Sequence, residues 1–401
     1  MTLSTLSTAD TISDGEYATD ADSFVLSWEQ AWRMFDEISL IRWKKSIFAM
    51  SVYPRTKEGF QEMTQEPLNV MVTGGTGFVG FHTVRALVSA GHSVRLLVRN
   101  PGKMRRVFAP FGLENLPWIE GDITDEASVN RALSGCNAVV HSAALVSVHA
   151  SDSEKVLNNN LLGTRLVLGG AWQRGIRRMI QVSSTTALFR RGIAGVDEHS
   201  PLGTALSGYG RSKIECEKFV RELQSKGAPI YTTYPGSIMG PDDPGLSEAM
   251  IGLRTFLNTR LLLDTSSGIQ IIDVRDLAKA HLALLERGGP PARYLIGGNY
   301  YSWTEYARLM KEITSRKLHR VSVRPGLLRA AGAIADFLSP FVNMDLPLSG
   351  ESVTYATEWA VANDSLIRKT LDLEYRATEK TLRDSIEWLH SSGHLNGGEK
   401  I

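Results

Sequence analysis

One stretch constrains the fold of this chain more than any other: residues Leu68–Gly80, which read LNVMVTGGTGFVG. A short apolar run precedes three glycines, Gly74, Gly77 and Gly80, which recur at three-residue intervals before a helical pattern begins. This order predicts a buried strand, a tight turn and a helix. Such a turn directs backbone N–H groups and the positive end of the helix dipole toward a pyrophosphate. The stretch therefore predicts a dinucleotide site.

The residues that complete the turn distinguish between two kinds of nucleotide site. The phosphate loop of nucleotide triphosphatases needs a Lys followed by Ser or Thr after its last glycine, whereas this turn has Phe78 and Val79. The mononucleotide alternative is therefore poor. We expect the backbone from Gly74 to Gly80 to bind the pyrophosphate of a dinucleotide.

Strand and helix patterns alternate after the turn. Phe78–Ala90 reads as a helix that Gly91 closes. The strands that we expect after it are Ser93–Val98, Trp118–Glu120, Ala138–Ser142, Met179–Ser183 and Ile230–Tyr234. This alternation predicts an α/β fold, a doubly wound parallel sheet of the Rossmann type.

The pattern divides the chain into three parts. Residues 1–66 are expected to form an N-terminal extension, a mobile tail followed by an amphipathic helix that begins near Ser27. Residues 67–240 are expected to form the dinucleotide-binding domain. Residues 241–395 are expected to form a smaller substrate-binding lobe, with some segments returning to the first domain and a closing helix over Thr381–His390.

Composition excludes several classes of function. The chain has 44 basic and 43 acidic residues among 401, so no charge excess favours nucleic acid as a partner. Cys136 and Cys216 are too few for a disulfide framework and fit a reducing compartment. The acidic first 28 residues have the wrong charge for a secretory or mitochondrial address, and no apolar run could span a bilayer. We therefore expect a cytoplasmic protein, and no metal site.

The end of the second strand indicates which dinucleotide is bound. An acidic residue there would accept hydrogen bonds from the ribose of NAD, but this strand is followed by Arg99. A guanidinium suits a 2′-phosphate, and Lys103 adds to its charge. NADP(H) is therefore favoured over NAD(H). Asp122, after the third strand, could accept a hydrogen bond from the adenine amino group or cap the following helix.

A second constellation supplies candidate catalytic groups. Tyr209 and Lys213 lie four residues apart in a helical pattern and so share one helix face. A tyrosine with a pKa of about 10 is a poor proton carrier at neutral pH, and a nearby ammonium stabilises its phenolate. Ser184, at the end of a predicted strand, would polarise a carbonyl by donating a hydrogen bond. The pair Tyr53 and Lys57 has the same spacing but contains Pro54, which disfavours a shared helix face.

Eight motifs together resemble the extended short-chain dehydrogenase/reductase family, over roughly Leu68 to Leu389. They are TGGTGFVG at 73–80, GDITD at 121–125, HSAA at 141–144, NLLGT at 160–164, VSS at 182–184, YGRSK at 209–213, YPGSIMGP at 234–241 and IDVRDLA at 272–278. The resemblance implies that Tyr209 is the acid/base and Lys213 its activator and a ribose ligand. It also implies that Ser184 is the carbonyl donor and that Asn160 lies near the active site. The remaining cofactor contacts that it implies are Ile123, Ala143, Ala144, Pro235 and Gly236.

The departures from the family pattern narrow the reaction. Sugar-nucleotide dehydratases of this family place an Asp–Glu pair after the active Ser or Thr, whereas this chain has Thr185–Thr186. The run SSTTALF is more similar to the branch of dihydroflavonol, cinnamoyl-CoA and 3β-hydroxysteroid enzymes. We therefore expect an NADP(H)-dependent oxidoreductase. The alternatives are an NAD-dependent sugar-nucleotide epimerase and a non-catalytic dinucleotide sensor or scaffold.

The substrate side is less constrained, and we expect a small or lipid-like substrate. Arg190, Arg191 and the basic stretch from Arg316 to Arg329 could hold an anionic substrate such as a CoA thioester or a nucleotide sugar. The apolar stretch Leu327–Phe341 could pack in the core or lie in a membrane interface. The sequence leaves open peripheral membrane contact and a homodimer.

Overall fold

The structure is a computed structural model. It describes residues 66–146, 152–204, 208–265, 267–315, 318–324, 326–328, 330, 332, 353–354 and 357–395, which all belong to one compact unit. The expected helix near Ser27 and most of the apolar stretch Leu327–Phe341 lie outside the described residues. The division of the compact unit at residue 240 stays a prediction.

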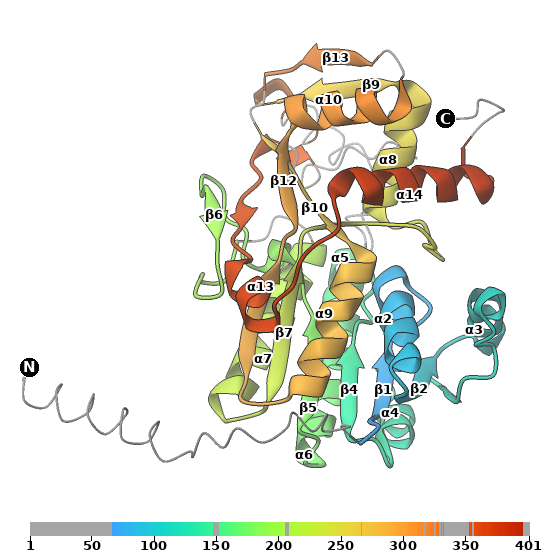
Figure 1. The fold of residues 1–401 in the computed structure, drawn as a ribbon. Coiled ribbons are helices and arrows are strands. Elements are labelled where there is room, and N and C mark those ends of the chain that lie inside the picture. Colours follow the sequence, from blue (N-terminus) through green and yellow to red (C-terminus); the bar gives the residue numbers. More distant parts are fainter. Residues whose placement is uncertain are drawn as a thin grey trace, which may run out of the picture. The chain divides into compact units, whose positions relative to one another are not determined.

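A seven-stranded sheet forms the centre of the molecule, and all of its strands are parallel (Figure 1). Its order is β11-β7-β5-β4-β1-β2-β3. The strands are β1 (Asn69–Thr73), β2 (Ser93–Val98), β3 (Trp118–Glu120), β4 (Ala138–His141), β5 (Arg178–Val182), β7 (Ile230–Pro235) and β11 (Ala292–Ile296). The chain reverses its direction of winding between β1 and β4, and ligands of such sheets bind outside the carboxyl ends of the strands at this point.

Alternate residues of the central strands enter two separate cores. Val70 and Val72 of β1 pack in one core, and Met71 between them packs in the other. Val139 and Val140 of β4 divide in the same way. Strands buried on both faces read as continuous apolar runs, which is why the sequence patterns locate them within a residue or two.

Helices cover both faces of the sheet (Figure 1). One core is covered by α2 (Phe78–Ser89), α3 (Pro101–Phe108), α9 (Val274–Arg287) and α13 (Ser365–Leu371). The other is covered by α4 (Glu126–Leu133), α6 (Gly170–Gln173), the segment η3 (Arg165–Gly169) and α7 (Gly208–Ser225). Helix α5 (Ser153–Thr164) packs along α7. The expected doubly wound α/β fold is therefore confirmed.

A third core lies beyond the carboxyl end of the sheet. It is built around a three-stranded sheet of β8 (Ser237–Met239), β10 (Gly268–Asp273) and β12 (Asn299–Ser302). The helices α8 (Glu248–Thr259), α10 (Trp303–Thr314) and α14 (Thr378–Ser391) pack on it. Two strand pairs complete the described fold: β9 (Leu261–Asp264) with β13 (His319–Ser322), and β6 (Gly195–Val196) with β14 (Val361–Ala362).

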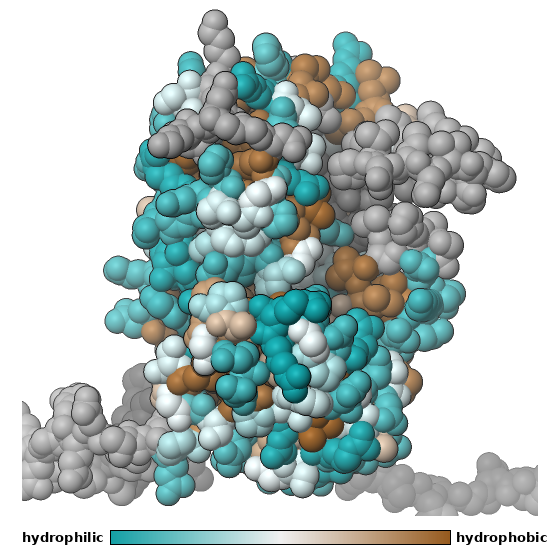
Figure 2. Space-filling view, turned by 90° about the vertical axis from the view of Figure 1, so that its right-hand side faces the viewer, coloured by the Kyte–Doolittle hydropathy of each residue, from teal (hydrophilic) through white to brown (hydrophobic). Residues whose placement is uncertain are grey.

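One face of the molecule is mainly hydrophilic, with hydrophobic residues scattered among hydrophilic ones (Figure 2). The large apolar side chains that are exposed lie on several different elements, among them Leu162 of α5, Leu261 of β9 and Val321 of β13. Among the described residues, every helix is too short or too polar to cross a bilayer.

Candidate active site

The glycine turn connects β1 to α2 and is packed against the end of β4. Gly74 has a φ of +71°, and a Cβ on it would lie 2.6 Å from the backbone nitrogen of Ala143. A Cβ on Gly80 would lie 2.2 Å from the carbonyl oxygen of Gly74. The N–H of Gly77 donates to the same oxygen at 2.9 Å. Glycine is thus required at positions 74 and 80 by the packing of the turn itself, whatever ligand it holds.

The turn leaves the first N–H groups of α2 without a side-chain acceptor. Gly77 is the N-cap of this 12-residue helix and offers no side-chain oxygen. The side chain of Phe78 packs in the third core, away from the turn, and Val79 is partly buried. Backbone donors and the positive end of the helix dipole are therefore available outside the turn. These groups fit a pyrophosphate.

The ends of β2 and β3 lie beside this turn in the sheet. Arg99 is exposed after β2, and the side chain of Asn100 caps α3 by accepting from the N–H of Lys103 at 2.8 Å. The carboxylate of Asp122 accepts from the N–H and the hydroxyl of Thr124, at 2.9 and 2.8 Å. The N-cap of α4 is instead Asp125. Of the two roles expected for Asp122, capping of α4 is therefore wrong. A hydrogen bond from the adenine amino group to Asp122 stays a prediction.

Ile123 and Ala143 each pack against a different element. Ile123 packs on α5, where a Cβ added to Gly163 would lie 2.4 Å from its Cδ1. The N–H of Ala143 donates to the hydroxyl of Thr73 at 3.3 Å, and Ala144 after it is exposed. These contacts hold the loop after β4 against the end of β1.

Helix α7 carries the candidate acid/base pair. The Nζ of Lys213 lies 5.6 Å from the ring centroid of Tyr209. It also donates to the carbonyl oxygen of Val182 at 3.3 Å, which ties α7 to the end of β5. Burial lowers the pKa of Lys213, whereas its electrostatic interactions with Cys216 and Glu217 oppose this effect. The structure thus brings the ammonium group to the ring, as the four-residue spacing predicted.

Ser184 lies two residues beyond the carbonyl that Lys213 contacts. Its hydroxyl donates to the Oγ1 of Thr186 at 2.9 Å and accepts from the N–H of Thr186 at 3.2 Å. It is the N-cap of the short 3₁₀-helix Thr185–Ala187, which packs against α7. Ser184 and the Tyr209 helix therefore meet at one edge of the sheet.

Pro235 and Gly236 follow at the end of the next strand. Pro235 is the last residue of β7, and the N–H of Gly236 donates to the carbonyl oxygen of Ile296 at 3.2 Å. A Cβ on Gly236 would lie 2.5 Å from the oxygen of Gly297. The close approach of this backbone to β11 fixes the direction in which the chain leaves β7.

Asn160 holds two parts of the site together. Its Oδ1 accepts from the N–H of Leu145 at 2.7 Å, and its Nδ2 donates to the oxygen of Leu145 at 3.0 Å. Its Nδ2 also donates to the hydroxyl of Ser212 at 3.0 Å. The amide is buried and links the loop after β4 to helix α7.

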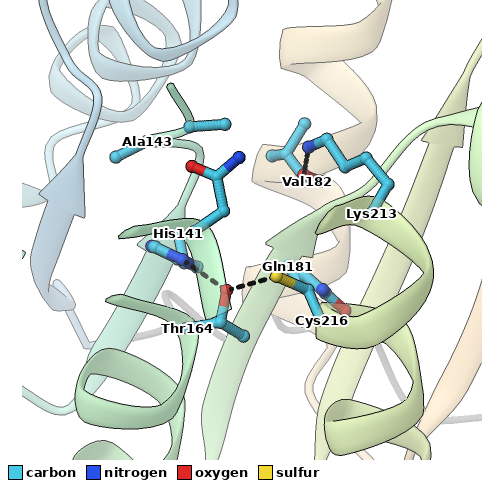
Figure 3. Close-up of a pocket in the computed structure, with 9 residues that line it drawn as sticks. His141, Ala143, Thr164, Gln181, Val182, Lys213 and Cys216 are labelled. Atoms are coloured by element: carbon cyan, nitrogen blue, oxygen red, sulfur yellow. Dashed lines mark hydrogen bonds between the residues drawn. The ribbon is translucent and has the colours of Figure 1, made fainter. Parts of the chain in front are cut away.

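A small cavity opens between these elements (Figure 3). It is lined by His141, Ala143, Ala144, Asn160, Thr164, Gln181, Val182, Lys213 and Cys216. The ammonium of Lys213 and the amide of Asn160 thus border one space with the backbone that follows β4. The sequence motifs HSAA and NLLGT contain His141 and Thr164, although neither residue was expected in the site.

A chain of hydrogen bonds joins three of the residues that line the cavity (Figure 3). The hydroxyl of Thr73 lies 2.8 Å from Nδ1 of His141, whose Nε2 lies 3.2 Å from the hydroxyl of Thr164. Thr164 in turn donates to the Sγ of Cys216 at 3.3 Å. This direction of donation places the proton of a neutral His141 on Nε2, in agreement with burial that lowers its pKa to about 3.

Three of the arginines that were expected on the substrate side have partners within the chain. Arg190 donates to the carbonyl oxygen of Leu202 at 2.9 Å. Arg191 pairs with Glu358 at 3.0 Å, and Arg320 pairs with Asp264. Arg316 and Arg329 lie outside the described residues. An anionic substrate would have to compete with these internal partners.

Comparisons with known proteins agree with this geometry. Residues 70–297 match the model of the NAD dependent epimerase/dehydratase family. The chain is 29% identical to a putative dihydroflavonol 4-reductase of Synechocystis sp. over 81% of this chain and 95% of the relative. It is 31% identical to the UDP-glucose 4-epimerase of Bos taurus over 62% of this chain and 83% of the relative. The crystal structure of gox2253 is similar with a TM-score of 0.68 and 26% identity, over 82% of this chain and 99% of the other.

The expected membership and enzyme class are thus confirmed. The glycine turn, the strand order and the Tyr–Lys helix occur together in the region that the family model matches. The chain belongs to the NAD dependent epimerase/dehydratase family and is an NAD(P)-dependent enzyme of the extended short-chain dehydrogenase/reductase type.

Proposed function

We propose that this enzyme is an NADP(H)-dependent oxidoreductase that transfers a hydride between nicotinamide and a carbonyl or secondary alcohol of a small or lipid-like substrate. One observation carries the proposal: the ammonium of Lys213 lies 5.6 Å from the Tyr209 ring and is fixed to the strand that leads to Ser184. A phenol, an ammonium and a hydroxyl at one sheet edge are the groups that carbonyl reduction requires.

Each group has a separate task. The nicotinamide cofactor, when bound at the glycine turn, supplies or accepts the hydride. In reduction, Tyr209 donates its phenolic proton to the carbonyl oxygen, and Ser184 donates a hydrogen bond to the same oxygen. The hydroxyl of Ser184 would exchange its present acceptor, Thr186, for that oxygen. Lys213 stabilises the phenolate that remains, because opposite charges at short range favour the ionised form.

Preference for NADP(H) is supported by the end of β2. Arg99 is exposed there, and the N-terminus of α3 begins at Pro101 with Lys103 in its first turn. We expect Arg99→Asp to lower the ratio of NADPH to NADH affinity by about tenfold or more, since a charge-assisted bond contributes about 1.5–3 kcal/mol. Arg106→Asp, an exposed residue of the last turn of α3, is the matched control. Equal ratios in the two variants would remove Arg99 from cofactor selection.

The class of substrate is supported by two observations. The similar dihydroflavonol reductase is named for a reduction, and three arginines near the substrate side are engaged within the chain. The first favours reduction of a carbonyl, and the second favours an uncharged substrate. The alternative is an NAD-dependent sugar-nucleotide epimerase, which the similarity to the bovine UDP-glucose 4-epimerase supports.

The nucleotide that the protein carries separates these alternatives. The freshly purified chain is denatured, and the released nucleotide is identified by mass spectrometry. A reductase exchanges its cofactor in each cycle, so we expect little bound nucleotide and uptake of NADPH in preference to NADH. Stoichiometric, non-exchanging NAD would overturn the proposal in favour of the epimerase, which returns its hydride in each cycle.

Three further proposals concern the surroundings of the enzyme: a cytoplasmic location, peripheral membrane contact and a homodimer. The apolar stretch on which membrane contact depends lies mostly outside the described residues. Co-sedimentation with anionic lipid vesicles at low salt tests that contact, and failure to sediment would exclude it. Sedimentation velocity tests the homodimer, for which a monomer at all concentrations is the contrary result.

A further inference from the structure

A buried carboxylate lies one helical turn beyond the catalytic lysine. Glu217 of α7 is 0% exposed and four residues from Lys213, so both side chains lie on one helix face. The hydroxyl of Tyr234 donates to Oε1 of Glu217, and Nε of Arg221 donates to it at 2.9 Å. The other oxygen, Oε2, is buried and has no hydrogen-bond partner in the described structure.

The partners of Glu217 come from segments that surround the active site. Tyr234 is fully buried and directly precedes Pro235 at the end of β7. Arg221 also donates to the carbonyl oxygen of Ser200 at 3.3 Å, in the segment between Ser184 and Tyr209. Burial raises the pKa of Tyr234 well above its usual value, so its hydroxyl remains a donor. The cluster therefore joins α7 to both flanking segments.

A structural link alone does not require a charge at this place. Burying a carboxylate is costly, and well-packed neutral residues are often as stable as a buried ion pair. Among the described residues, the titratable groups that act electrostatically on Lys213 are Tyr209, Cys216 and Glu217 on α7 and His141 on β4, with Glu217 acting across one helical turn rather than in a direct ion pair. Burial keeps His141 neutral and raises the pKa of the Cys216 thiol. The anion in this group is Glu217.

We propose that Glu217 is a positioning residue of the catalytic helix, held by Tyr234 and Arg221 so that its carboxylate is the counter-ion of the buried Lys213 ammonium. The same contacts fasten α7 to the strand that leads into Pro235 and Gly236. This inference rests on the proposed function, in which the charge of Lys213 serves both Tyr209 and the cofactor. Arg221 lies a further turn away from Lys213, where its guanidinium holds the carboxylate of Glu217 in place.

The test measures NADPH affinity against pH for the full chain, by quenching of tryptophan fluorescence, and needs no substrate. Glu217→Gln keeps the size of the side chain and removes its charge. Glu215→Gln removes a charge from the outer side of the same helix, where Glu215 pairs with Lys218, and is the matched control. We expect the loss of affinity at alkaline pH to begin about one unit lower in Glu217→Gln, since a nearby opposite charge shifts a pKa by about 1–3 units. The Glu215→Gln profile should match the unchanged chain.

A second variant separates charge from folding. Tyr234→Phe removes one hydrogen bond and keeps the Glu217–Arg221 ion pair, so we expect its pH profile to match the unchanged chain while its melting temperature falls. If Glu217→Gln fails to fold, a downward shift in the profile of Tyr234→Phe overturns the proposed division of roles, and an unshifted one supports it. A folded Glu217→Gln with an unshifted profile also overturns the proposal. If the unchanged chain binds neither NADPH nor NADH, the proposed function itself fails, and this inference fails with it.

Discussion

Replacing the buried His281 should make the stability of the fold less sensitive to acid. His281 of α9 is 0% exposed and lies between two hydroxyls, with Nδ1 3.0 Å from Thr83 of α2 and Nε2 3.1 Å from Thr233 of β7. Burial lowers its pKa from 6.5 to about 3. In the unfolded chain the same ring titrates at about 6.5.

The sign of the effect follows from proton uptake on unfolding. Between about pH 6.5 and pH 3 the ring of His281 binds a proton in the unfolded chain but stays neutral in the folded chain. The contribution of His281 to the free energy of unfolding is therefore full above pH 6.5 and is lost as the pH falls toward 3. At about pH 4.5, two units below the unfolded value, the loss is about 2.7 kcal/mol at 1.36 kcal/mol per unit. His281→Gln keeps a polar side chain but does not titrate in this range.

Urea unfolding of the full chain at about pH 7 and pH 4.5 measures the effect. The free energy of unfolding of the unchanged chain should fall by about 2.7 kcal/mol more than that of His281→Gln. His390→Gln, at an exposed position of α14, is the control and should behave as the unchanged chain. An equal pH dependence in His281→Gln and the unchanged chain would refute the reasoning.

Three other substitutions test the packing of the site. Gly80→Ala should lower the free energy of unfolding by about 1–3 kcal/mol and weaken NADPH binding, because its Cβ would lie 2.2 Å from the Gly74 oxygen. The Cβ of Gly77→Ala would lie 3.3 Å from its nearest neighbour, so this control should lose clearly less stability. Equal losses of stability in urea unfolding would contradict this account. Asn160→Ala should lower the free energy of unfolding by about 2–4 kcal/mol, because it leaves the N–H and the carbonyl of Leu145 without their partner and removes a donor to Ser212, whose hydroxyl keeps its bond to the Tyr209 carbonyl. A loss below about 0.5 kcal/mol would show that these bonds are dispensable. Cys216→Ala should keep turnover within about twofold, because burial raises the pKa of the thiol and a thiol is a poor nucleophile; abolished turnover with normal NADPH binding would contradict this assignment.

The sequence predicted six of the seven strands of the central sheet and missed the edge strand β11. The inner strands are buried on both faces and therefore give clear apolar runs. β2 and β3 have the predicted boundaries, and the ends of β4 and β5 differ by one residue. The helix after the glycine turn ends at Ser89, one residue early, where Gly91 adopts a φ of +85°. Apolar runs and turn glycines depend only on neighbouring residues, so they can be recognised in the sequence.

Residues whose role depends on distant partners were harder to predict. Asp122 and Asp125 both precede α4, and only the conformation of the loop decides that Asp125 caps it. Glu217 reads as a solvated residue of an amphipathic helix, and its burial follows from Tyr234, which is 17 residues away. His141 and Thr164 meet Cys216 only because β4, α5 and α7 pack together. Such contacts between distant segments leave no periodic pattern.

The internal partners of the arginines were equally hard to predict from the sequence. Arg190 and Arg191 read as free positive charges near the substrate, but one caps the carbonyl of Leu202 and the other pairs with Glu358, 167 residues away. Because a sequence shows charges without their partners, it overstates the charge that is available to a ligand.

The most direct test of the proposed chemistry is Tyr209→Phe, which removes the phenolic hydroxyl and keeps the ring beside Lys213. A carbonyl substrate is first found by screening ketones, aldehydes and CoA thioesters with NADPH, and oxidation of NADPH is then followed at saturating substrate. We predict unchanged NADPH affinity and a turnover about 10²–10⁴ times lower, the contribution of a positioned general acid. Turnover at the rate of the unchanged chain would contradict the assignment of Tyr209 as the proton donor.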